Sequence, residues 1–184
     1  YRETSWGHAL CLADEVFTWP PAVHDQGLQS RFFEVIKAAF ATENPMMQLV
    51  CAIRIRPFHW FLTDERRQLH YELVWNKPKH ASVLSWSLSI ARYYPDTDRA
   101  KIFRLLLDRS YLIDPSHLAE SLGKQVGVGS MHVFVNEQRS AVAEIARNTI
   151  ASPDSFPLLQ DATNRSEFLR GLIFGMKEQA KLVS

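Results

Sequence analysis

Nine prolines divide this 184-residue sequence into short segments, and this division limits what each segment can form. Proline has no backbone N–H group and restricts the residue before it, so a helix seldom continues through one. Between the prolines, apolar residues recur at helical spacing, beginning with residues 28–41. The pattern predicts a chain built mainly from helices that start or end close to prolines.

The segment that follows Asn44 fits either a helix or a strand over 49–55. We favour the helix, because an Asn cap followed by a first-turn proline is a typical start. Further helices are predicted over 63–77, 81–94, 96–113 and 114–123, with Pro115 in the first turn of the last one and Gly123 at its end. Residues 1–125 therefore read as a helical N-terminal domain, and Lys124–Gly129 as the hinge that follows it.

The composition is that of an ordinary globular chain, with 46% hydrophobic and 22% charged residues. Cys11 and Cys51 lie far apart, without the clustered Cys and His of a zinc site, so we expect neither a disulfide framework nor a metal. No apolar run reaches the roughly 18 residues that a membrane helix needs. The sequence therefore predicts a cytoplasmic protein with no membrane partner.

Positive charge is concentrated in the centre of the chain. The net charge is +1, but residues 51–110 carry 11 basic and 6 acidic side chains. Arg54 and Arg56 belong to this basic part. If the protein binds nucleic acid, its attraction for phosphate is expected to come from here, since the last third of the chain is electrically balanced.

The last third of the chain is predicted to contain a strand, unlike the helical part before it. Residues 131–135 alternate like a strand, Asn136 can cap a helix after it, and a second helix is predicted to begin near Thr163. A single strand cannot satisfy its own edge groups, so we expect it to pair with the same strand of a second copy. The predicted dimer core consists of Met131, Val133, Val135, Val142, Ile145, Phe168, Leu169, Leu172 and Ile173. Pairing within one chain, with a strand near 49–55, stays open as the alternative.

The stretches "MHVFVNEQ" and "TNRSEFLRGLI" resemble the ribbon-helix-helix family of transcriptional regulators. With a larger helical domain in front of it, the arrangement looks like the AcaB-type activators of plasmid conjugation genes. The resemblance implies a homodimer that places its β-ribbon in the major groove of double-stranded DNA and acts beside other transcription factors. It assigns base contacts to His132, Phe134 and Asn136. The phosphate contacts are expected at the start of the second helix, from Thr163, Asn164, Arg165 and Ser166. Arg54 and Arg56 of the basic centre are expected to add further phosphate contacts.

The expected fold is therefore mainly helical α+β: a helical domain over 1–125 and a ribbon-helix-helix module over 129–184. The expected function is a sequence-specific DNA-binding regulator without a cofactor. The alternative is a protein-binding adaptor that dimerises through the same module without contacting DNA. Charge discriminates between them, because a DNA binder should gather arginines around the ribbon, whereas an adaptor should leave an apolar or mixed surface there. No nucleophile, phosphate-binding or metal-ligand motif indicates an enzyme.

Overall fold

The computed structural model describes residues 25–54, 68, 71–76, 78, 80–92, 94–110, 115–136 and 140–183. The chain divides into two compact units, Tyr1–Pro78 and Lys79–Ser184, and each is described by itself.

The first unit contains α3 (Gln26–Ala41), α4 (Pro45–Arg54) and a π-helical turn, η2 (Glu72–Asn76). Both α4 and η2 pack against α3. The Asn44 side-chain oxygen accepts the N–H groups of Met46 and Met47 at 3.0 and 3.3 Å, which caps α4. Residues 49–54 are therefore helical, and the alternative of a strand there is wrong.

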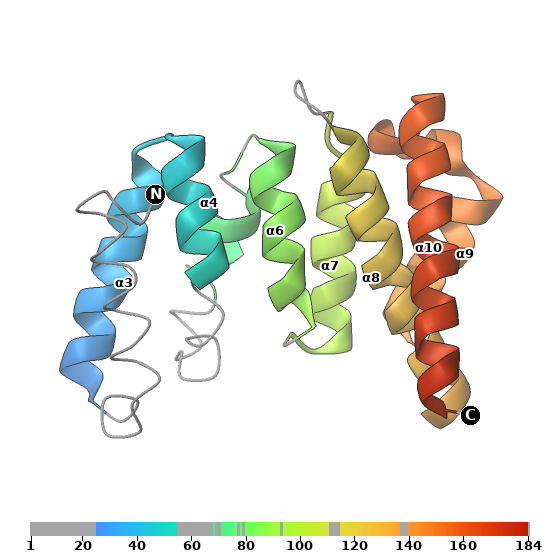
Figure 1. The fold of residues 1–184 in the computed structure, drawn as a ribbon, viewed down its shortest axis with the longest axis horizontal. Coiled ribbons are helices and arrows are strands. Elements are labelled where there is room, and N and C mark those ends of the chain that lie inside the picture. The colour runs from blue at the N-terminus through green and yellow to red at the C-terminus, as the bar shows by residue number, and fades with distance from the viewer. Residues whose placement is uncertain are drawn as a thin grey trace. The chain divides into compact units, whose positions relative to one another are not determined.

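The second unit contains five longer helices (Figure 1): α6 (Ala81–Ala91), α7 (Asp96–Leu107), α8 (Pro115–Asn136), α9 (Ala141–Ala151) and α10 (Ala162–Val183). Two short 3-10 turns, η3 (Pro153–Ser155) and η4 (Pro157–Leu159), connect α9 to α10. In this unit α8 packs against α6, α9 and α10, and α7 packs against α9. The predicted break between helices at Pro95 is confirmed.

The prediction of an α+β fold is wrong. The described part of the chain contains no strand, and residues 131–136, predicted to form the ribbon and the cap after it, are the last residues of the 22-residue helix α8. The five alternating residues were too few to separate a strand from a helix end. Without a strand at 131–135 there is no ribbon-helix-helix module in this part of the protein.

The glycines of α8 explain why the helix continues through the predicted hinge. A Cβ atom added to Gly123 would lie 2.1 Å from the backbone oxygen of Phe168, and one added to Gly127 would lie 2.3 Å from that of Leu172. The glycines of α10 are equally close to α8. A Cβ atom on Gly171 would lie 2.1 Å from the backbone oxygen of Glu120, and one on Gly175 would lie 2.2 Å from that of Lys124. The glycines therefore serve close helix contact rather than flexibility.

These contacts also fix the direction of the pair. Gly123 meets Phe168 and Leu172, and four residues later Gly127 meets Leu172 and Met176. Residue numbers rise together along both helices, so α8 and α10 are parallel, and their first turns lie at the same end of the pair (Figure 1). Two glycines spaced four apart on each helix let the two backbones meet along one face.

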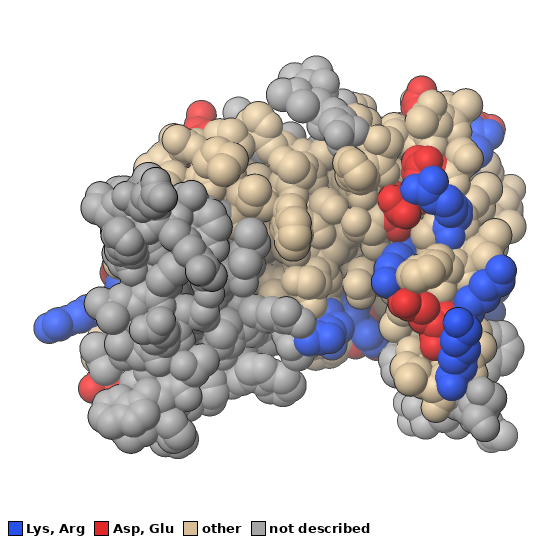
Figure 2. Space-filling view, in the orientation of Figure 1, with Lys and Arg blue, Asp and Glu red and all other residues tan. Residues whose placement is uncertain are grey.

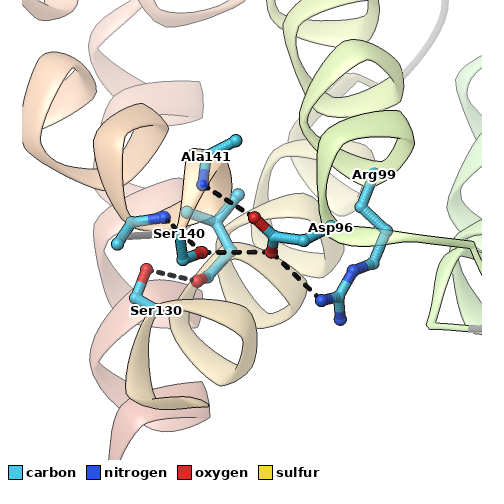
Figure 3. Close-up of polar contacts among 7 residues, drawn as sticks. Asp96, Arg99, Ser130, Ser140 and Ala141 are labelled. Atoms are coloured by element: carbon cyan, nitrogen blue, oxygen red, sulfur yellow. Dashed lines mark hydrogen bonds and ion pairs between the residues drawn. The ribbon is translucent and has the colours of Figure 1, made fainter. Parts of the chain in front are cut away.

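The starts of α7 and α9 are joined by the carboxylate of Asp96 (Figure 3). Asp96, at the start of α7, accepts the N–H of Ala141 at 2.7 Å and the hydroxyl of Ser140 at 3.0 Å, and it pairs with Arg99 at 3.1 Å. The Ser140 oxygen in turn accepts the N–H of Ala143 at 3.2 Å. Ser140, rather than Asn136, therefore caps α9, because α8 ends only at Asn136.

Within the described residues, no helix is long and apolar enough to cross a membrane.

Candidate functional site at the first turn of α10

The first turn of α10 is capped by its own carboxylate. Asp161 immediately precedes the helix, and its Oδ1 atom accepts the N–H of Asn164 at 3.0 Å. Thr163 and Asn164, predicted as cap and phosphate contacts, thus lie inside the helix. An aspartate at a helix start stabilises the unpaired N–H groups and the positive end of the helix dipole. It also places a negative charge where the resemblance predicted a phosphate.

Arg165 bonds to the connector that precedes α10, and its side chain is 34% exposed. Its guanidinium forms an ion pair with Asp154 of η3. Its Nε atom donates to the carbonyl oxygen of Leu159 in η4 at 3.1 Å. The side chain therefore ties α10 to the connector that precedes it. Neighbouring Ser166 is exposed on the first turns of the helix.

A cavity of about 540 Å³ opens beside this turn. It lies where the first turns of the parallel helices α8 and α10 meet the connectors before them, and such a volume is typical of ligand sites. Its described lining consists of Ser110, Pro115, Ser116, Pro157, Leu158, Gln160, Asp161, Thr163 and Asn164. The wall combines apolar rings and a leucine with hydroxyl, amide and carboxylate groups.

Asn164 is the unusual member of this lining. It is only 8% exposed, yet its carboxamide makes no hydrogen bond with any described residue. Its amide atoms are not among the buried unpaired atoms of the described residues, so they are accessible to solvent at the cavity wall.

Two basic side chains of the α8–α10 surface, those of Lys124 and Arg170, are paired with acidic side chains. Arg170 lies 3.0 Å from Glu120 and also pairs with Glu167, while Lys124 lies 2.9 Å from Glu178 and 4.5 Å from the ring centre of Phe174. Figure 2 shows blue and red side chains alternating over this face. The described surface of the pair is thus mixed in charge rather than a basic stripe.

The structure separates the predicted dimer core into two groups. Val142, Ile145, Phe168 and Leu172 are buried inside this chain, and Met131 is half-buried. Leu169 and Ile173 are 37% and 53% exposed on the outer side of α10. Burial within one chain does not require a dimer, so the dimer stays a prediction.

Several predicted DNA contacts have side chains outside the described part of the protein. This holds for His132, Phe134 and Asn136, and for the core candidates Val133 and Val135, whose backbone belongs to α8. Arg54 ends α4 with an undescribed side chain, and Arg56 lies outside the described residues altogether. Their assignment as DNA contacts therefore stays a prediction.

Three features of the site were missed from the sequence: the Asp161 cap, the Arg165–Asp154 pair and the α8–α10 contact. The last had a visible signal, since Gly123 and Gly127 share the four-residue spacing of Gly171 and Gly175. The Asp161 cap also had a local signal, since aspartate is a common residue at a helix start, whereas the Arg165–Asp154 pair depends on how the connector folds. Among described residues, no group of three or more His, Cys, Asp or Glu side chains is arranged to hold a metal ion.

No family model, no curated protein and no solved structure matches this chain.

Proposed function

We propose that this protein is a protein-binding adaptor whose second unit, Lys79–Ser184, engages partners without contacting DNA. The observation that carries the proposal is the paired charge of the α8–α10 surface, because a phosphate-binding face needs cations that are available. Arg165, the residue best placed for a phosphate, is already paired with Asp154.

The helical architecture supports the same proposal by analogy, since surfaces built from packed helices commonly bind other proteins. The outer side of α10 adds the exposed apolar side chains of Leu169 and Ile173, flanked by the charged residues Arg170 and Lys177. Apolar anchors within a polar rim are typical of protein interfaces.

The DNA-binding hypothesis has lost the element on which base reading depended. The ribbon is replaced by the end of α8, and the described residues offer no other element with unpaired basic side chains at a helix start. The basic centre around Arg54 and Arg56 is a separate source of positive charge, so the test must use the full chain.

The test is the sedimentation mass of the full chain, alone and with a random duplex of about 30 base pairs, at low and moderate salt. We expect no duplex-dependent increase in mass at moderate salt. Arg165→Ala should leave any weak binding at low salt unchanged, because this arginine is held by Asp154. Duplex binding that persists at moderate salt, or a salt slope that Arg165→Ala flattens by about one charge, would overturn the proposal.

A further inference from the structure

We draw no further inference here: the strongest candidate, the apolar outer side of α10 at Leu169 and Ile173, is an exposed helix face, and nothing in the described part of the structure shows what covers it.

Discussion

At the scale of single residues, polar side chains at helix starts hold the second unit together. Asp96 bonds to the first turn of α9, Asp161 to the first turn of α10, and Arg165 to the connector between those helices. The contacts of Asp96 and Arg165 join segments that helix propensity alone would leave independent, whereas Asp161 caps the helix that it precedes. The ends of the helices, rather than their middles, therefore set how the connectors run.

Asp96→Ala should lower the free energy of unfolding by about 2 kcal/mol, because it removes a charged cap from α9 and the partner of Arg99. The Arg99 side chain is 17% exposed, and its Nε atom is buried without a hydrogen-bond partner among the described residues, so loss of the carboxylate leaves a poorly solvated charge. Urea denaturation followed by circular dichroism measures the change.

The matched control is Asp98→Ala, in the same turn of α7. Asp98 is more exposed and pairs with Lys101 at 3.2 Å, a surface contact worth at most about 1 kcal/mol. Equal losses in the two variants would mean that general charge at the start of α7, rather than the bond to α9, explains the effect.

At the scale of elements, the central feature is the contact between α8 and α10. Gly123→Ala should destabilise the protein by about 2 kcal/mol or more, although alanine is the better helix former by about 1 kcal/mol. The reason is that the new Cβ would lie 2.1 Å from a backbone oxygen of α10, which cannot move aside as a side chain can. Thermal or urea unfolding of the variant checks this.

Gly27→Ala provides the control, since it is the same substitution in the first turn of α3. Its Cβ would meet a single side-chain oxygen, that of Asp25, at 3.2 Å. This variant should be as stable as the wild type or slightly more so. If Gly123→Ala behaved like Gly27→Ala, α8 and α10 would not be in backbone contact.

The comparison of sequence and structure is informative at this scale. The start of α4 and the break before α7 were predictable, because Asn44-Pro45 and Pro95 act within a few residues of themselves. The helix over 131–136 was not, because α8 continues through its glycines owing to contacts with α10, some 48 residues later in the chain. Alternating Met131, Val133 and Val135 then imitated a strand. Local sequence patterns therefore predicted the helix starts, which local bonds determine. They failed at residues 131–136, where packing against a distant helix determines the structure.

The sequence predicted two residues of the candidate site, but not their contacts. Asn164 and Arg165 were selected from the sequence, but for a phosphate, and the structure gives Arg165 a partner in Asp154. The cavity itself depends on two helix starts that lie 47 residues apart in sequence, at Pro115 and Ala162. Its existence follows from the parallel packing of α8 and α10, which the predicted ribbon excluded.

At the scale of the whole molecule, the described residues form two helical units, and the proposed function is assigned to the second. The proposed adaptor function depends on one structural claim, that α8 is a continuous helix packed parallel to α10 through glycines. If residues 131–135 were instead a strand, the DNA-binding ribbon would return.

The most direct test is a ¹³C-edited NOESY spectrum of the full chain with isotope-labelled glycine and backbone assignments. We predict cross-peaks from the Gly123 α-protons to backbone protons of Phe168 or Leu172, and from the Gly127 α-protons to those of Leu172 or Met176. We also predict helical Cα shifts for residues 131–136. Absence of the glycine cross-peaks, together with strand-like shifts at 131–135, would contradict the parallel packing of α8 and α10.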